Sequence, residues 1–175
     1  MKRFARLSFV ACSAALIASA CGTNAPRSIG ESPRDNRLVG AWRSQIRFNG
    51  GTLGGISDLE FLYAYNTGGT MTESSNYDEA ANSSPPAYGV WRQVGPNKFE
   101  TKYLFYQTRA ATVADGVANT GGWLPAGHGV LTETIALSAD GAAYTSTINY
   151  AAFDKNGKPG EGSGAGTGAG TRIVF

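Results

Sequence analysis

The chain has 175 residues, with 15 Lys and Arg against 13 Asp and Glu, and two cysteines. Lys2, Arg3 and Arg6 lie at the N-terminus, which leaves 12 basic against 13 acidic residues in the rest of the chain. That balance, without a basic patch interleaved with aromatics, excludes a nucleic-acid-binding protein. The two cysteines are Cys12 and Cys21, and Cys12 lies in an N-terminal segment that we expect to be removed, so a disulfide in the mature fold is excluded too.

The first 20 residues have the pattern of an export signal. Their basic start is followed by the uncharged stretch Leu7–Ala20, which is too short to cross a bilayer as a helix. We therefore predict a signal peptide over residues 1–20. Its end allows either cleavage after Ala18-Ser19-Ala20 or a bacterial lipobox in which Cys21 is acylated.

A cysteine directly after small residues is unusual in this cysteine-poor chain, so we favour the lipoprotein. The expected location is the cell envelope, in the outer membrane or periplasm, with a lipid on Cys21 as the membrane contact; plain secretion is the alternative. Residues 21–37 contain Pro26, Pro33 and small polar residues without apolar periodicity, which indicates a flexible tether.

From residue 38 to residue 175 the apolar period becomes two. In Trp42–Phe48, apolar residues alternate with arginine and glutamine, as in a strand with one face in water. Further strands, joined by turn signals, are expected at residues 59–65, 70–74, 88–94, 98–108, 129–138, 143–153 and 162–175. No segment predicts a convincing helix. The pattern predicts an all-β, eight-stranded antiparallel up-and-down barrel, because closure removes exposed sheet edges.

Two segments bear on whether this barrel is hollow. The Gly-rich loop of residues 109–127 carries Trp123 and is expected to cover the mouth of the barrel. In the last segment, glycine occupies every even position from Gly160 to Gly170, so one face of that strand is bare. Ordering such a strand costs roughly 0.5–1 kcal/mol per glycine relative to alanine. Either neighbouring aromatic side chains fill the bare face, or a ligand uses the space.

Residues 38–42, Leu-Val-Gly-Ala-Trp, resemble the lipocalin-like, or calycin, group of small barrels. The stretch from residue 38 to residue 172 is also similar to bacterial lipocalin-like proteins with Gly-Val-Trp and Val-Gly-Pro-x-x-Phe segments. The resemblance implies that Gly40 and Trp42 begin the first strand and that Arg172 packs across the tryptophan to close the floor. Trp91, in a second Gly-x-Trp-Arg segment, competes for that position.

This sequence also departs from the lipocalin pattern. The lipocalin disulfide and C-terminal helix are absent, which keeps avidin-like and fatty-acid-binder-like barrels as alternatives. The single histidine, His128, stands between glycines at a strand start, where a solvated turn residue is favoured over a catalytic base. One histidine and no spaced cysteines argue against a zinc site, so we expect no metal and no cofactor.

Two carboxylates interrupt apolar strand faces. Glu73 follows Met71, and Glu133 lies between Leu131 and Ile135. A carboxylate that faces inward needs a partner or a raised pKa, because burial of an unpaired charge is costly. We favour outward-facing positions or an arginine partner; the alternative is that both carboxylates are polar anchors in an aromatic cavity.

These features predict a cell-envelope barrel that binds a small hydrophobic or aromatic molecule. The candidate ligand-binding residues are Phe48, Phe61, Tyr63, Glu73, Tyr103, Phe105, Trp123, Glu133 and Tyr150, with Trp42, Ile46, Leu59 and Phe99 as further walls. A cyclase or isomerase that uses a carboxylate or a tyrosine is one alternative, and a structural lipoprotein with a solid core is another. Gly166→Leu is expected to abolish ligand uptake while the barrel still folds.

Overall fold

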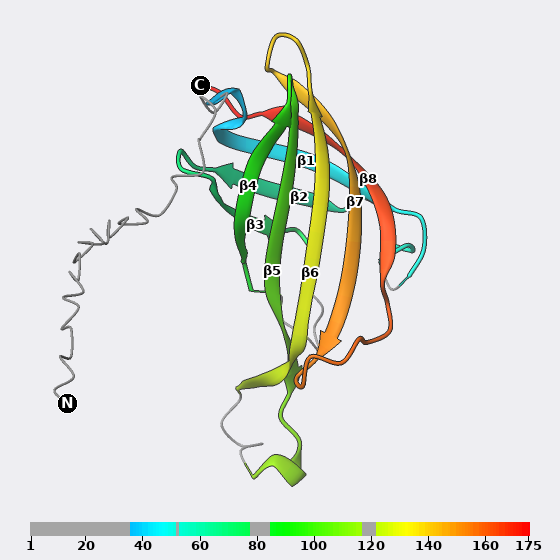
Figure 1. Cartoon of the computed structure of the whole chain (residues 1–175). Helices are drawn as coiled ribbons and strands as arrows, with labels where there is room; N and C mark the ends of the chain where they lie inside the picture. The colour runs from blue at the N-terminus through cyan, green and yellow to red at the C-terminus, as the bar shows by residue number, and fades with distance from the viewer. Residues whose placement is uncertain (1–35, 52, 78–84, 117–121) are drawn as a thin grey trace, which may run out of the picture. The chain divides into compact units, whose positions relative to one another are not determined.

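The computed structural model describes residues 36–51, 53–77, 85–116 and 122–175. Its eight strands form a closed barrel, each antiparallel to its sequence neighbour, with β8 paired back to β1 (Figure 1). This confirms the predicted all-β up-and-down barrel. The strands are β1 (Gly40–Phe48), β2 (Glu60–Tyr65), β3 (Thr70–Ser75), β4 (Ala87–Gly95), β5 (Lys98–Ala110), β6 (Trp123–Leu137), β7 (Ala143–Asp154) and β8 (Gly164–Arg172). The predicted signal peptide, Cys21 and the tether up to residue 35 lie outside the described residues.

The core comes from the alternation of side chains along the strands. In β1 the side chains of Trp42, Ser44, Ile46 and Phe48 are buried and the positions between them are exposed. Cross-strand partners share a face of the sheet, so the register carries this division around the ring. Tyr63 of β2, for example, pairs with Trp42 and is buried with it.

The glycine-rich strand β8 closes the barrel. Gly166, Gly168 and Gly170 pair with inward-facing residues of β1 and are buried, so the bare face of the strand points toward the barrel axis. The prediction that the last strand pairs with the Trp42 strand is confirmed. The strand ends at Arg172, however, and residues 173–175, which were expected to continue it, are exposed.

Neighbouring side chains fill the space beside these glycines. A Cβ atom at Gly170 would overlap the ring of Tyr144. One at Gly166 would lie 2.5 Å from the carbonyl oxygen of Arg47. The bare face therefore lets neighbouring residues approach β8 closely, which supports the alternative in which neighbouring side chains fill it. For the same reason Gly166→Leu would disturb the backbone of the β1–β8 pair.

Trp42 and Arg172 seal one end of the barrel, which we call the closed end. The guanidinium carbon of Arg172 lies 4.3 Å from the centroid of the Trp42 ring, within cation–π range. The guanidinium donates hydrogen bonds to the backbone carbonyls of Arg37, Val39 (2.7 Å) and Gly141 (2.9 Å). The indole Nε1 of Trp42 donates to the carbonyl of Leu38 at 2.9 Å. Every polar group of this pair is thus directed at a backbone acceptor.

Gly40 makes the close approach at this end possible. Its φ of +135° is a conformation that residues with a side chain rarely adopt, and a Cβ atom there would lie 2.7 Å from Nη1 of Arg172. The Gly-x-Trp spacing therefore has a steric reason in this chain.

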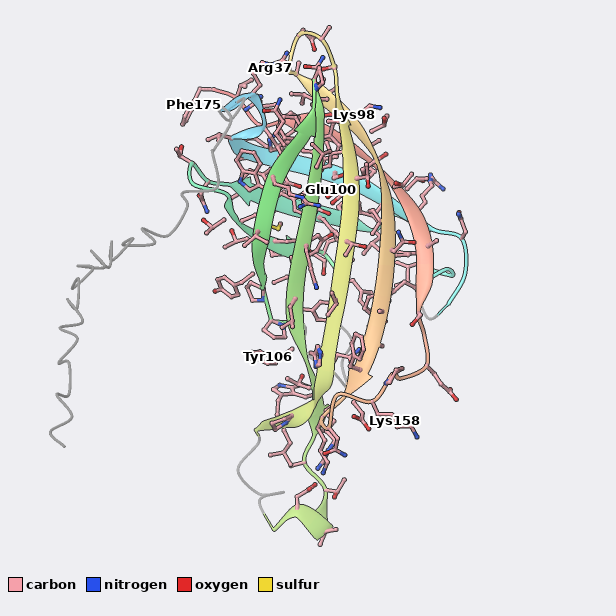
Figure 2. All side chains as sticks on the ribbon, in the orientation of Figure 1. Arg37, Lys98, Glu100, Tyr106, Lys158 and Phe175 are labelled. Carbon is pink, nitrogen blue, oxygen red and sulfur yellow. The ribbon has the colours of Figure 1, made fainter. Side chains whose placement is uncertain are left out.

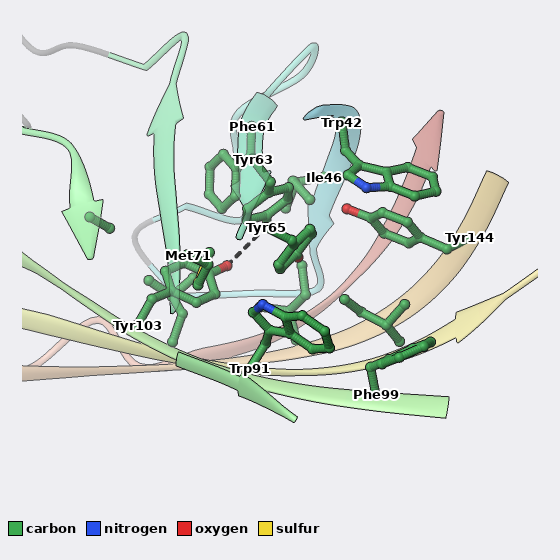
Figure 3. Packing of buried hydrophobic residues seen from close by; sticks show 14 of the residues in the cluster. Trp42, Ile46, Phe61, Tyr63, Tyr65, Met71, Trp91, Phe99, Tyr103 and Tyr144 are labelled. Carbon is green, nitrogen blue, oxygen red and sulfur yellow. Dashed lines mark hydrogen bonds between the residues drawn. The ribbon is translucent and has the colours of Figure 1, made fainter. Parts of the chain in front are cut away.

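Trp91 lies at the same end but has a different role. Its ring packs edge-on against Tyr65 and Phe99 (Figure 3). Its Nε1 donates a hydrogen bond to the carbonyl of Asn66 at 3.0 Å. The ring that packs on Trp42 is that of Tyr144, at a centroid distance of 5.0 Å. Of the two tryptophans that could meet Arg172, Trp42 is the one that does.

The hairpin of β5 and β6 is longer than predicted. Arg109 pairs with Leu124 and Ala110 with Trp123, so both ends of the expected loop of residues 109–127 are strand. A register irregularity near residue 107 admits Pro125, which cannot donate a ladder hydrogen bond. Helical structure in the described residues consists of the short turns η1 (Asn36–Leu38) and η2 (Val113–Asp115), and no helix there has the length and apolarity to cross a membrane.

Candidate functional site

Several inward-facing side chains in the barrel are polar, although apolar and aromatic side chains surround them. We call this group the polar lumen. Its members are Ser44 (β1), Tyr63 (β2), Glu73 (β3), Thr101 and Tyr103 (β5), Glu133 (β6) and Ser146 (β7), with the hydroxyl groups of Tyr65 and Tyr144. All are buried. Soluble proteins rarely bury this many polar groups in one place unless each finds a partner.

Glu133 is the more deeply buried of the two carboxyl groups of the polar lumen. It stands between inward-facing Leu131 and Ile135 on β6, pairs with Thr101 of β5, and is 2% exposed. Neither of its carboxyl oxygens has a hydrogen-bond partner among the protein's own atoms. The period-two pattern that places Leu131 and Ile135 in the core thus places a carboxyl group there as well.

Glu73 contributes a second inward-facing carboxyl group. It pairs with Tyr63 across the β2–β3 ladder, is 7% exposed, and its Oε1 has no hydrogen-bond partner. The favoured interpretation that both glutamates face outward or pair with an arginine is therefore wrong. The strand pattern alone decides the direction, because a residue flanked at i±2 by core residues shares their face.

Burial raises the pKa of both carboxyl groups toward neutrality. Removal from water disfavours the charged form and raises the pKa of Glu73 to about 8, with a further contribution from the charge of Glu133. Burial likewise raises the pKa of Glu133 to about 7, partly offset by the hydroxyls of Ser146 and Tyr63. Those hydroxyls lie near the carboxyl group but outside hydrogen-bonding geometry. The pair therefore retains protons at neutral pH.

Tyrosine rings and hydroxyls form the wall between the two carboxyl groups. The hydroxyls of Tyr63 and Tyr103 share a hydrogen bond of 2.9 Å, drawn as a dashed line in Figure 3, and their rings meet edge-on at 5.9 Å. Burial, with the charge of Glu133 next in importance, raises the pKa of both phenols well above the usual value. Both tyrosines therefore stay protonated and can donate as well as accept hydrogen bonds.

Several hydroxyl groups of the polar lumen are buried without a partner. These are Oγ of Ser44 and Ser146, Oγ1 of Thr101 and the phenolic oxygens of Tyr65 and Tyr144. An unsatisfied buried polar group costs about 1–3 kcal/mol, and native proteins satisfy most such groups with protein, water or ligand atoms. This concentration of unpartnered donors and acceptors is the feature of the barrel that most resembles a binding site.

An aromatic zone lies toward the other end of the barrel from Trp42. Its rings are those of Phe48, Phe61, Phe105 and Tyr150. Phe105 stacks on Tyr150 at 6.0 Å, and Gln107 donates to the hydroxyl of Tyr150 at 2.8 Å. Gly129 of β6 provides the space for this stack, since a Cβ atom there would overlap both rings.

Most of the residues predicted to bind a ligand come together inside the barrel. Phe48, Phe61, Tyr63, Glu73, Tyr103, Phe105, Glu133 and Tyr150 all occupy inward-facing positions, as do the further wall residues Trp42, Ile46 and Phe99, with Leu59 buried just before β2. Trp123 does not join them. It begins β6 opposite Ala110, where its side chain is 42% exposed.

His128 also lies away from the polar lumen. It is a strand residue of β6 rather than a turn residue, and its ring stacks on Phe153 at 5.0 Å. Its partner on β5 is Tyr106, which points outward from the barrel (Figure 2). The imidazole therefore belongs to the outer surface.

Sequence reasoning missed the small polar members of the polar lumen: Ser44, Thr101, Ser146 and the hydroxyls of Tyr65 and Tyr144. The available signal was the same alternation, because Ser44 lies between Trp42 and Ile46 on one face of β1. No buried residue in the described part of the chain is a lysine, arginine or histidine. No group of three His, Cys, Asp or Glu side chains in the described ranges could hold a metal ion.

Comparison with known proteins gives no family to which the site can be assigned: no family model matches the chain, and no curated protein matches its sequence. The interpretation of the polar lumen therefore depends on its own chemistry.

Proposed function

We propose that this protein binds a small molecule inside the barrel, with an apolar or aromatic part near Phe61 and Phe105 and a polar part in the polar lumen. The observation that supports this most is the set of buried, unpartnered polar atoms around Glu133. A bound molecule gains affinity from the apolar surface it buries, about 25 cal/mol per Å², and its orientation from a few convergent polar groups.

We place this binding protein in the cell envelope. The support is the export pattern of residues 1–20 and the cysteine that follows it, which together fit a lipid-anchored bacterial protein. The Gly40–Trp42–Arg172 arrangement supports a relationship to lipocalin-like barrels, whose members include small-molecule carriers.

A second candidate is an enzyme, a cyclase or isomerase acting on a small hydrophobic substrate. It is favoured by one observation, the carboxyl groups whose pKa values of about 7 and about 8 lie near neutrality. Such groups suit general acid–base catalysis. Turnover of a retained substrate that disappears in Glu133→Gln, while binding persists, would favour the enzyme over the carrier.

The binding proposal is tested with a neutral naphthalene fluorophore and two variants on β7. Ser146→Leu adds an apolar side chain to the polar lumen, whereas Thr147→Leu places the same side chain on the outer face. Saturable uptake should be lost in Ser146→Leu and kept in Thr147→Leu, with circular dichroism to verify folding. Thr101→Leu serves in place of Ser146→Leu if that variant does not fold.

Native mass spectrometry of the protein from its own envelope adds a direct measurement. We expect a retained small molecule and an acyl group on Cys21. If the wild-type protein retains no molecule and shows no saturable uptake, the binding proposal is wrong and a structural lipoprotein becomes the better account.

A further inference from the structure

The two inward-facing carboxyl groups approach the barrel axis from different sides. Glu73 belongs to β3 and Glu133 to β6, three strands apart in a ring of eight. Tyr63 connects the two positions, since it pairs with Glu73 across the β2–β3 ladder, and the charge of Glu133 contributes to the raised pKa of both Tyr63 and Glu73. Since no buried residue in the described part of the chain is basic, the interior has acidic groups and no cation of its own to balance them.

Aromatic residues also lie beside these carboxyl groups. Tyr63 meets Tyr103 and Phe61 edge-on, at 5.9 and 6.0 Å, with interplanar angles of 81° and 77°. Tyr65 stacks on Tyr63 at 5.5 Å, so three aromatic rings pack around Tyr63. Buried carboxyl groups among aromatic rings, with no buried base in the described residues, form a chemical setting that favours a positive charge over a negative one.

We propose that the molecule bound in the polar lumen is an amine, whose protonated nitrogen lies between Glu73 and Glu133. This inference depends on the proposed binding function and names its ligand class. An ammonium group has three N–H donors and no acceptor. It therefore matches the unpartnered oxygens Oε1 of Glu73 and Oε1 and Oε2 of Glu133.

Other ligand classes fit these atoms less well. A neutral alcohol offers one donor, so it leaves most of the carboxyl oxygens unsatisfied. An anionic ligand would meet two carboxyl groups and no buried base, which is unfavourable in a low-dielectric interior. An amine both donates to the oxygens and balances their charge.

The binding of an amine should be linked to proton release. The groups that face Glu133 are Glu73, Ser146, Tyr63, Tyr65, Tyr103 and Tyr144, of which the tyrosines stay protonated. The carboxyl pair carries protons at neutral pH because burial raises its pKa values to about 7 and about 8. A bound ammonium favours the ionised carboxylates and expels those protons. Amine affinity should thus rise with pH up to about 8.

The test uses three probes that share one ring system: naphthylmethylamine, naphthylmethanol and naphthoate. Isothermal titration calorimetry of the wild-type protein, in two buffers of different ionisation enthalpy, measures both affinity and proton release. We expect the amine to bind at least about tenfold more tightly than the alcohol, naphthoate to bind most weakly, and proton release to accompany the amine alone.

Variants then assign the preference to the carboxyl pair. Glu73→Gln and Glu133→Gln should each reduce the amine-over-alcohol ratio by roughly fivefold or more, without weakening the alcohol. Glu100→Gln is the matched control, because Glu100 lies on the outer face of β5 in an ion pair with Arg92. It should leave the ratio unchanged.

The outcomes separate this inference from the proposed function. If the alcohol binds as tightly as the amine, the amine inference is wrong while binding in the barrel stands. If the amine preference persists in both glutamine variants, the cation binds elsewhere and the inference is again overturned. If none of the three probes binds, both the inference and the proposed function fail.

Discussion

The closed end and the polar lumen belong to the same barrel but differ in whether their buried polar groups have hydrogen-bond partners. At the closed end, the indoles of Trp42 and Trp91 and the guanidinium of Arg172 all donate to backbone carbonyls. In the polar lumen, Glu133 has no hydrogen-bond partner at either carboxyl oxygen. One region is built of satisfied polar groups and aromatic contacts, and the other holds buried polar groups without a hydrogen-bond partner.

This difference supports the proposal that the closed end stabilises the fold and that the polar lumen binds a ligand. A sequence that folds well usually agrees with physical rules at every level, and exceptions concentrate at functional sites. The polar groups of the closed end have hydrogen-bond partners, so this region can offset the free-energy cost of the unpartnered polar groups next to it. The polar lumen breaks the rule that buried carboxyl groups are paired, and the four predictions below test whether that contrast is real.

Removal of the Trp42 ring should have the largest effect, because it breaks the closed end. The buried indole packs between Arg172 and Tyr144, so Trp42→Ala should lower the free energy of unfolding by about 4 kcal/mol. Trp123→Ala is the control; Trp123 is 42% exposed, and its loss should change the free energy by less than about 0.5 kcal/mol. Denaturant unfolding measures both, and equal losses would contradict the assignment of Trp42 to the closed end.

A change of pH should act on the polar lumen. On folding, the pKa rises from 4.5 to about 8 for Glu73 and to about 7 for Glu133. Between about pH 4.5 and these values, the native state therefore holds more protons than the unfolded state. The contribution of this pair to the free energy of unfolding is therefore greatest below about pH 4.5, and it falls as the pH rises to about 8. The slope is about 1.4 kcal/mol per pH unit for each extra proton held.

Thermal unfolding of the ligand-free protein at a series of pH values measures this slope. A melting temperature that increases with pH across the same window would show that the carboxyl groups are ionised and stabilised in the fold.

Replacement of a carboxyl group by its neutral isostere should stabilise the barrel in alkaline conditions. At about pH 8, Glu133→Gln removes a buried charge and should raise the free energy of unfolding by about 2 kcal/mol. At about pH 5 the carboxyl group is already protonated, so the same variant should change little. Chemical denaturation at the two pH values makes the comparison. A loss of stability at the higher pH would mean that Glu133 has a stabilising partner.

A methyl group on the inner face of β8 should have the smallest of these effects. Gly170→Ala places a Cβ atom against the ring of Tyr144 and should lower the free energy of unfolding by about 1–2 kcal/mol. Gly50→Ala is the control, since a Cβ atom there would meet no atom within 4 Å. If the two variants unfold alike, the filled glycine face described above is wrong.

The fold could be predicted because its signal is local. Alternation in Trp42–Phe48 and glycine at every second residue of β8 each fix which face of a strand is bare or buried, and turn residues fix the strand order. The extension of β6 to Trp123 was missed because Pro125 and nearby glycines normally interrupt a strand; here a register irregularity admits the proline.

The site was predicted only in part. The aromatic residues and both glutamates were named from the sequence, but outward positions or an arginine partner were favoured for the glutamates because an unpaired buried charge is costly. The rule that buried charges are paired holds for ordinary cores. The alternation of Leu131, Glu133 and Ile135 on β6, however, indicated that Glu133 shares the inward face of its neighbours. Which residues of different strands meet across the barrel, such as Tyr63 and Tyr103, depends on the register and tilt of the closed ring, which sequence patterns do not specify.

The most direct test is a measurement of the protonation of the two carboxyl groups in the folded, ligand-free protein. Isotope-edited infrared spectroscopy with labelled glutamate follows the protonated carboxyl band as the pH changes, and Glu73→Gln and Glu133→Gln assign the signal to each residue. The structure predicts midpoints near the pKa values of about 8 for Glu73 and about 7 for Glu133. Midpoints near 4.5, the ordinary value, would mean that both groups are solvated or paired, and would contradict the polar lumen as described.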